Sequence, residues 1–139
     1  MKSLSIVVPV YRDGALAMDF CQSLVQLNDK FLDVNVNQLE VIFVSDGIAE
    51  DIPHLQDACR RFDFAKYIAF TRNFGQHIAI SCGLIHSTGD LVCYTDVDME
   101  DPPSELPRLI RKLEESNSQI CAGLRIGKKV SFVTRLTSR

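Results

Sequence analysis

The stretch LSIVVPV at residues 4–10 determines the fold class of this chain of 139 residues. It is an almost unbroken apolar run rich in β-branched side chains, which is the pattern of a strand buried on both faces. Similar short runs follow at residues 39–44, 67–70 and 91–95, and residues 120–124 form a candidate fifth strand. Strands buried on both faces are typical of parallel sheets that are covered by helices.

Helical patterns separate these runs. Apolar side chains recur at helical spacing within residues 14–28, 50–62 and 104–115, and residues 75–86 form a further expected helix of mostly small and apolar residues. Because strands and helices alternate, we expect a single α/β domain over residues 1–139, with a mainly parallel sheet flanked by helices. Right-handed crossovers would place the loops after the strands along one edge of the sheet, where open α/β sheets bind ligands.

The bulk composition narrows the class of protein. Hydrophobic residues make up 46% of the chain and the net charge is −3, so no overall basic field favours nucleic acid as a partner. The five cysteines show no metal-ligand spacing and are typical of reduced core thiols. The start has no signal-peptide pattern, and no run approaches about 20 apolar residues. We therefore expect a cytoplasmic location.

Polar side chains follow each of the first four predicted strands. A capping or turn role would explain Asp46 or Asp101 taken singly, but turn chemistry does not require all four groups. In strand order, the residues that follow the strands are Pro9, Tyr11, Arg12 and Asp13; Ser45, Asp46 and Gly47; Thr71, Arg72, Asn73, Phe74 and Gly75; and Asp96, Asp98, Glu100 and Asp101.

The fourth group suggests a metal site. In an extended segment, Asp96 and Asp98 point to the same side, and two carboxylates so close disfavour their own ionisation unless a cation lies between them. Oxygen ligands suit Mg²⁺ or Mn²⁺. Because the chain contains neither GxGxxG nor GxxxxGK[ST], we expect a bound phosphate to be held mainly through the metal.

Four segments together resemble a known family, the family 2 glycosyltransferases of the GT-A fold. They are SIVVPVYRDG, EVIFVSDGIAED, FTRNFGQHIAISCGLIHSTGD and VCYTDVDMEDPPSELPRLI. RNFGQH and DVDMEDPP are most similar to the branch that transfers sugars to polyprenyl phosphates, such as dolichol-phosphate mannosyltransferase and undecaprenyl-phosphate glucosyltransferase. The resemblance implies a UDP- or GDP-linked sugar donor, Mg²⁺ or Mn²⁺, and inversion at the anomeric carbon in cell-surface polysaccharide synthesis.

The resemblance also implies roles for individual residues. Pro9, Tyr11 and Asp13 would shape the nucleotide pocket, Asp46 would contact the base or ribose, and Arg72 and Asn73 would line the donor site. Asp96 and Asp98 match the metal-binding pair, and Arg125 matches an arginine for the acceptor phosphate. The chain departs from the family pattern at Arg12-Asp13, where Asn-Glu is usual, and at Ser45, where an acid is usual.

Members of this family continue well beyond 139 residues, so we expect the chain to be the donor-binding part of a longer domain. In the full-length form we expect it at the cytoplasmic face of a membrane. Arg135 and Arg139, with Phe132, Val133 and Leu136, fit a basic amphipathic surface for anionic lipid, but the pattern favours an ordinary helix that packs on the rest of the protein. Self-association is a further expectation.

Three other readings stay open. The acceptor could be a saccharide hydroxyl instead of a polyprenyl phosphate, which would require a general base. The chain could be an inactive nucleotide-binding or assembly module. A flavodoxin-like phosphoacceptor protein also has acids at its strand ends, but it would need a lysine at the end of its last strand, and ICAGLRIG has none inside that run.

Overall fold

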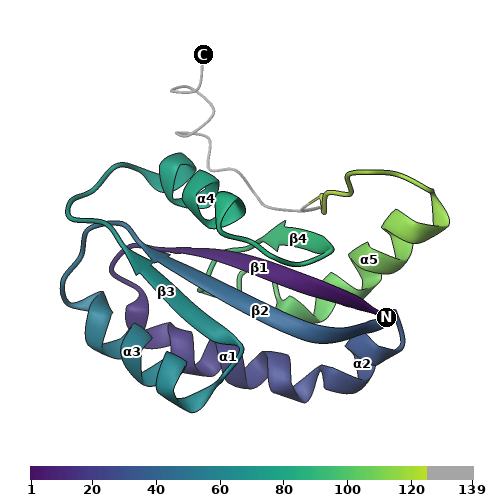
Figure 1. The fold of residues 1–139 in the computed structure, drawn as a ribbon, viewed down its shortest axis with the longest axis horizontal. Helices are drawn as coiled ribbons and strands as arrows, with labels where there is room; N and C mark the ends of the chain where they lie inside the picture. The colour runs from purple at the N-terminus through teal and green to yellow at the C-terminus, as the bar shows by residue number, and fades with distance from the viewer. Residues whose placement is uncertain (125–139) are drawn as a thin grey trace, which may run out of the picture.

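The computed structural model describes residues 1–124 and contains a four-stranded parallel sheet (Figure 1). The strands are β1 (Lys2–Val10), β2 (Val36–Ser45), β3 (Ala65–Ala69) and β4 (Leu91–Tyr94), in the spatial order β3-β2-β1-β4. Every neighbouring pair is parallel, so the predicted α/β class with a parallel sheet is confirmed. The chain moves outward from β1 to β3 and then returns to the other side of β1, which creates a topological switch point beside β1.

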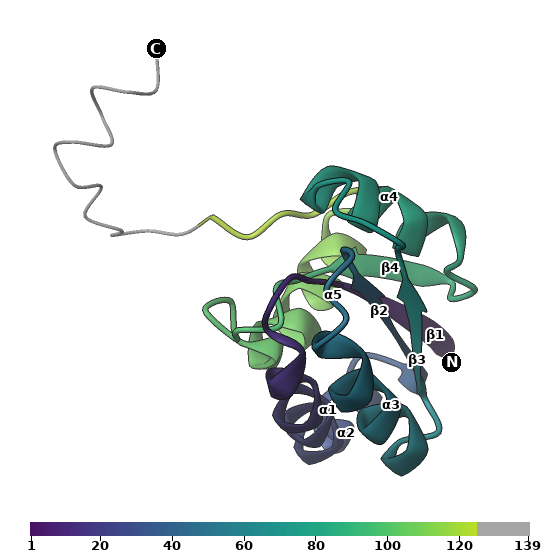
Figure 2. The same ribbon diagram turned by 90° about the vertical axis from the view of Figure 1, so that its left-hand side faces the viewer.

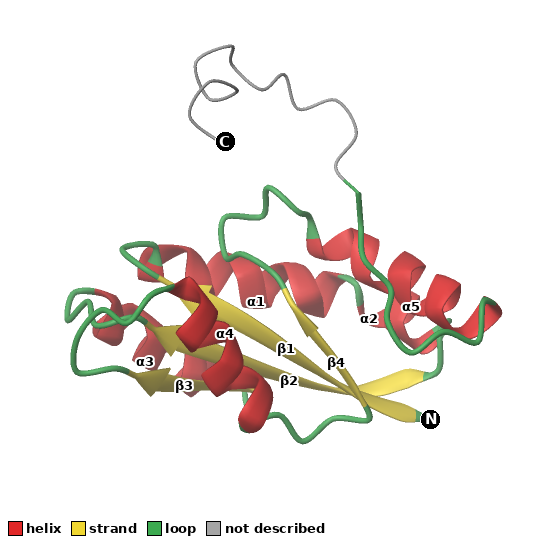
Figure 3. Ribbon diagram, turned by 90° about the horizontal axis from the view of Figure 1, so that it is seen from above, coloured by secondary structure: helices red, strands yellow, loops and turns green. Residues whose placement is uncertain are grey.

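Helices cover both faces of the sheet unequally (Figures 2 and 3). One face carries α1 (Ala17–Gln26), α3 (Asp51–Arg61) and α5 (Leu106–Glu115), with the short α2 (Asn28–Leu32) near the start of the strands. The other face carries α4 (Gln76–Ile85), which packs on β1 and β2. This arrangement agrees with right-handed crossovers, because the chain reverses its direction across the sheet when it crosses to the α4 face.

The main core lies between the sheet and the helices α1, α3 and α5. Alternate residues of β1 (Leu4, Ile6, Val8 and Val10) are all buried on this face. The Phe20 ring of α1 meets the Phe43 ring of β2 edge to face, with centroids 6.1 Å apart. The face under α4 holds a smaller apolar cluster, and Gly83 lets the helix lie directly on Val7.

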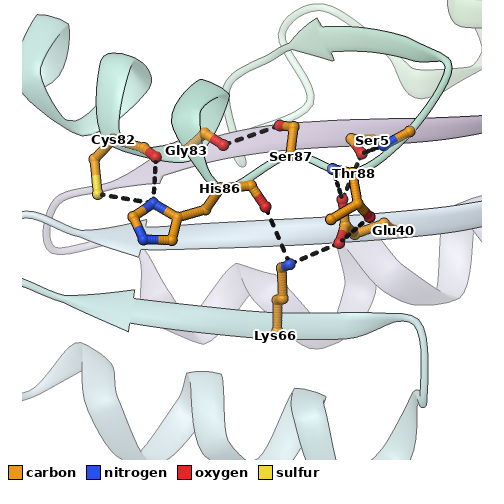
Figure 4. A network of polar contacts seen from close by, with 9 residues as sticks. Ser5, Glu40, Lys66, Cys82, Gly83, His86, Ser87 and Thr88 are labelled. Atoms are coloured by element: carbon orange, nitrogen blue, oxygen red, sulfur yellow. Dashed lines mark hydrogen bonds and ion pairs between the residues drawn. The ribbon is translucent and has the colours of Figure 1, made fainter.

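A polar network joins three strands to the loop before β4 (Figure 4). The Glu40 carboxylate accepts hydrogen bonds from Lys66 Nζ at 2.6 Å, from Ser5 Oγ, and from the backbone N–H and hydroxyl of Thr88, both at 3.0 Å. Gly89 N–H donates to Ser5 Oγ at 2.8 Å. These bonds fix residues 88–89, and thereby help to set the register of the short strand β4.

Two sequence expectations need correction. Residues 120–124 form no strand, and Ile120 and Leu124 are 85% and 89% exposed. The run has no neighbouring strand with which to pair among residues 1–124, and a short apolar segment alone does not supply the missing backbone partners. The cysteines are all free, as predicted, but they are not all core residues, because Cys121 is exposed.

The described helices give no evidence of a membrane span. Within residues 1–124, none of the helices is both long enough and apolar enough to cross a bilayer. The segment around Phe132 and Arg135, for which the sequence left a membrane-surface role open, lies outside the described residues.

Candidate donor site at the carboxyl ends of the strands

A cavity of about 320 Å³ opens at the carboxyl ends of β1, β2 and β4. Its size is in the range of small-molecule sites. It lies at the switch point of the sheet, where open α/β sheets bind ligands. The lining residues come from four chain segments: Pro9, Val10, Tyr11 and Asp13; Asp46; Asn73, Gly75, Gln76 and Ala79; and Asp96, Val97 and Asp98.

A buried carboxylate, that of Asp51, binds the backbone of the segment after β1. Asp51, at the start of α3, is 3% exposed and accepts the backbone N–H groups of Arg12 at 3.0 Å and Gly14 at 2.9 Å. Arg12 has a positive φ of 66°, which turns the chain sharply after Tyr11. The Arg12 guanidinium lies 5.2 Å from the centre of the Tyr11 ring. This turn places Tyr11 and Asp13 at the cavity.

The segment after β2 organises the loop that precedes α4. Asp46 is 3% exposed, and its two carboxylate oxygens accept the backbone N–H groups of Phe74 at 2.7 Å and Gly75 at 3.0 Å. Gly47 has φ +80°, and a Cβ on it would lie 2.1 Å from the backbone carbonyl carbon of Arg72. Only glycine permits so close an approach, so this turn sets the position of Asn73 at the cavity wall.

The segment after β4 delivers two carboxylates to the cavity. Val97 is 3% exposed and packs in the main core, while Asp96 and Asp98 on either side of it line the cavity. Asp98 Oδ1 accepts the backbone N–H of Glu100 at 2.9 Å, and Met99 between them has a positive φ of 57°. Asp96 Oδ1 accepts a hydrogen bond from Gln76 Nε2 at 3.0 Å.

The structure brings together most of the residues that the sequence singled out. Seven of them line the cavity: Pro9, Tyr11, Asp13, Asp46, Asn73, Asp96 and Asp98. Arg72 is not among the lining residues, and its guanidinium lies over the Phe74 ring, 4.5 Å from the centroid. Arg125 lies outside the described residues. Sequence reasoning missed Gln76, although it lies within the RNFGQH segment at the start of a predicted helix.

The carboxylate oxygens at the cavity are suitable ligands for a hard divalent cation. Asp96 and Asp98 offer only carboxylate oxygens, which Mg²⁺ and Mn²⁺ accept. Within residues 1–124, no three His, Cys, Asp or Glu side chains are grouped so that they could hold a metal ion. A cation at this pair would therefore need further oxygen ligands from water or from phosphate, as Mg²⁺ sites at nucleotides usually have.

A family comparison identifies the class of protein. The model of glycosyl transferase family 2 matches residues 5–139, which is nearly the whole chain. The chain belongs to glycosyl transferase family 2. The cavity of this family 2 domain is therefore a candidate site for the sugar donor.

Individual relatives agree with this assignment. The domain is 32% identical over 117 residues to undecaprenyl-phosphate 4-deoxy-4-formamido-L-arabinose transferases from two strains of Klebsiella pneumoniae. That match covers 83% of this chain and 35% of each relative, so the chain spans about a third of their length.

A solved structure also shares the fold. It is a mannosyltransferase from Pyrobaculum calidifontis in complex with GDP-Man and Mn²⁺, and it superposes with a TM-score of 0.64 at 20% sequence identity. The match covers 81% of this chain and 32% of that one. At this identity the likeness shows a shared fold, which confirms the GT-A architecture expected from the sequence.

Proposed function

We propose that this family 2 domain binds a nucleotide-diphosphate sugar through Mg²⁺ or Mn²⁺ and serves its transfer, with inversion, to a polyprenyl phosphate. The observation that carries the proposal is the convergence of four carboxylates on one cavity. Asp13, Asp46, Asp96 and Asp98 come from three different strand ends and line the same space.

Electrostatics supports a metal-assisted donor site. No Lys or Arg from residues 1–124 lines the cavity, so every charged side chain that a diphosphate would meet there is negative. Such an arrangement repels an anion unless a cation neutralises the carboxylates and the phosphates together. Asp46 already binds two backbone N–H groups, so Asp96 and Asp98 are the candidate metal ligands. The Mn²⁺ in the solved mannosyltransferase is consistent with this reading.

The chemistry divides between the cation and the side chains. The bound cation would neutralise the charge that develops on the leaving diphosphate. Asp98 and Asp96 would both hold the cation. Tyr11, which is 45% exposed at the cavity, offers an aromatic face on which a base could stack. Pro9, Asp13 and Asn73 would complete the walls of the nucleotide pocket.

We favour a phosphate acceptor over a hydroxyl acceptor, for a chemical reason and because of the relatives. A phosphate monoester has a second pKa of about 6, so it is ionised near neutral pH and needs positioning more than deprotonation. The acceptor named in the relatives at 32% identity is undecaprenyl phosphate, which supports this choice. Arg125, with Lys128 and Lys129, is the sequence candidate for the acceptor phosphate.

Calorimetric titration tests the donor site directly. UDP and GDP would be titrated into the native chain and into Asp98→Ala, each with and without Mn²⁺. We expect Mn²⁺-dependent binding of one of the two nucleotides and its loss in Asp98→Ala, with an unchanged circular dichroism spectrum. Glu105→Ala, which removes an exposed carboxylate that pairs with Arg108, is the matched control and should bind as the native chain does.

Two results would count against the proposal. Equal nucleotide affinity with and without Mn²⁺ would remove the metal from the function. No nucleotide binding by a folded native chain would favour the module reading, in which the domain serves assembly alone. If donor binding is established, transfer of radiolabelled sugar to undecaprenyl phosphate or to an oligosaccharide, measured with the full-length protein, separates the two acceptor classes.

A further inference from the structure

We infer that Gln76 is a positioning residue that holds Asp96 for the metal and couples metal binding to nucleotide binding. The inference rests on the proposed function and deepens it. Gln76 is the first residue of α4, and its side-chain amide donates from Nε2 to Asp96 Oδ1 at 3.0 Å. Both residues line the donor cavity.

The position of Gln76 is fixed independently of Asp96. Gly75 precedes it with φ +96°, a conformation that favours glycine, and this turn starts α4 at the cavity edge. Asp46 accepts the N–H groups of Phe74 and Gly75, so the start of α4 is tied to the end of β2. Gly83 lies close to the Val7 side chain and seats the same helix on β1. The amide of Gln76 therefore extends from an anchored helix end.

Asp96 comes from a different part of the chain than Gln76, which contacts it from the start of α4. It follows β4, a strand of four residues that pairs with β1 alone in the described sheet, and it precedes the turn at Val97 and Asp98. A hydrogen bond from a side chain on another element restricts the carboxylate to fewer rotamers. Such outer-shell partners typically contribute 10- to 100-fold to metal affinity.

The same contacts form a continuous connection across the cavity mouth. It runs from Asp46 through the backbone N–H groups of residues 74–75 to the first residue of α4, and from there through Gln76 to Asp96. Asn73 and Gly75 in this connection also line the cavity. A nucleotide that contacts residues 73–75 would thus bind the same anchored segment whose Gln76 holds the metal-binding carboxylate. Linkage then requires the metal to strengthen nucleotide binding by the same factor.

The test is a titration of Mn²⁺ into three proteins: the native chain, Gln76→Met and Gln56→Met. Electron paramagnetic resonance measures the Mn²⁺ that stays free in solution. Methionine keeps the length of glutamine but cannot donate a hydrogen bond. Gln56 of α3 is the matched control. Its amide donates to Tyr67 Oη of β3 at 3.1 Å, and neither residue lines the cavity. Titrations of UDP and GDP without metal, and thermal melts, would accompany each variant.

We expect Gln76→Met to bind Mn²⁺ about 10-fold more weakly, the low end of the outer-shell range because the bond is exposed. Its nucleotide affinity without metal should equal that of the native chain, whereas a general structural defect would lower both. The enhancement of nucleotide binding by Mn²⁺ should also fall, because linkage requires the variant to lose more Mn²⁺ affinity when nucleotide is bound than when it is absent. Gln56→Met should match the native chain in all three measurements.

Native Mn²⁺ affinity and native enhancement in Gln76→Met would overturn the inference while leaving the proposed function intact. Weaker nucleotide binding without metal, together with a lower melting temperature, would also overturn it by showing that Gln76 serves the fold. Absence of Mn²⁺ binding by the native chain, with or without nucleotide, would overturn the proposed function itself.

Discussion

Replacing Glu40 by glutamine should remove a pH-dependent part of the stability. Burial alone would raise the pKa of this carboxyl, but the hydrogen bonds from Lys66, Ser5 and Thr88 outweigh burial and lower the pKa from 4.5 to about 2. A group whose pKa is lower in the folded than in the unfolded chain stabilises the fold above its unfolded pKa. That contribution is lost as the pH falls from about 4.5 towards 2.

The structure sets the size of the effect. A pKa that falls from 4.5 to about 2 on folding corresponds to about 3 kcal/mol of stability at pH 7. The Glu40 side chain is 21% exposed and that of Lys66 is 44% exposed, so solvent screens the pair and reduces this figure. We expect Glu40→Gln to lower the free energy of unfolding by about 1–2 kcal/mol at pH 7.

Urea denaturation between pH 2 and pH 8 measures the effect. The difference between the native chain and Glu40→Gln should be constant above about pH 5 and should disappear towards pH 2. Glu114→Gln is the matched control, because Glu114 also pairs with a lysine, Lys2, at 2.8 Å but in a more exposed setting. We expect its loss to stay below about 0.5 kcal/mol. A difference for Glu40→Gln that is independent of pH, or equal to that of Glu114→Gln, would refute the reasoning.

Two further predictions concern close packing and thiol chemistry. Gly47→Ala should lower the free energy of unfolding by about 3 kcal/mol or prevent folding. Gly47 has φ +80°, and a Cβ there would lie 2.1 Å from the Arg72 backbone. Gly123→Ala is the control: a Cβ there meets nothing within 4 Å, so this variant should unfold in urea as the native chain does. Burial raises the pKa of Cys21 and Cys93 to about 12, whereas Cys121 is exposed, so iodoacetamide at pH 8 should alkylate Cys121 first in a peptide map. Equal rates at Cys93 and Cys121 would contradict this ordering.

The sheet could be predicted because its two central strands, β1 and β2, are buried on both faces over most of their length. The runs at residues 4–10, 39–44 and 91–95 are apolar over most of their length, and each matches an observed strand. The boundaries were less accurate. Strand β2 begins at Val36, because its exposed residues Asn37 and Gln38 still extend alongside β1. Backbone pairing with a neighbour fixes such an end, and hydrophobic patterning does not detect it.

The same dependence on a neighbour explains the incorrect fifth strand. Residues 120–124 have the apolar character of a strand, but no strand among residues 1–124 pairs with them. Composition indicates where an extended segment would be compatible with burial. It does not say which strand would supply the backbone hydrogen bonds, and a strand is stable only when they are made.

The candidate site shows a sharper division between what sequence can and cannot predict. Parallel topology alone brings Asp46, Asp96 and Asp98 to one edge of the sheet, so their convergence followed from the order of strands and loops. The task of each carboxylate did not follow. Asp46 binds the backbone of residues 74–75, 28 and 29 positions further along the chain. That contact exists because Gly47 and Gly75 adopt positive φ values and let the two loops approach.

These two glycines therefore separate the task of Asp46 from the tasks of Asp96 and Asp98. With Asp46 engaged by the loop before α4, the start of that helix is fixed, and Gln76 can reach Asp96. Asp98 accepts one N–H from its own turn and lines the cavity as an exposed side chain. In this arrangement Asp46 fixes the loop before α4, and Gln76 orients Asp96. Of these three carboxylates, Asp98 is the most accessible to a cation. A substitution at Asp46 should therefore disturb nucleotide and metal binding together, whereas one at Asp98 should act through the metal.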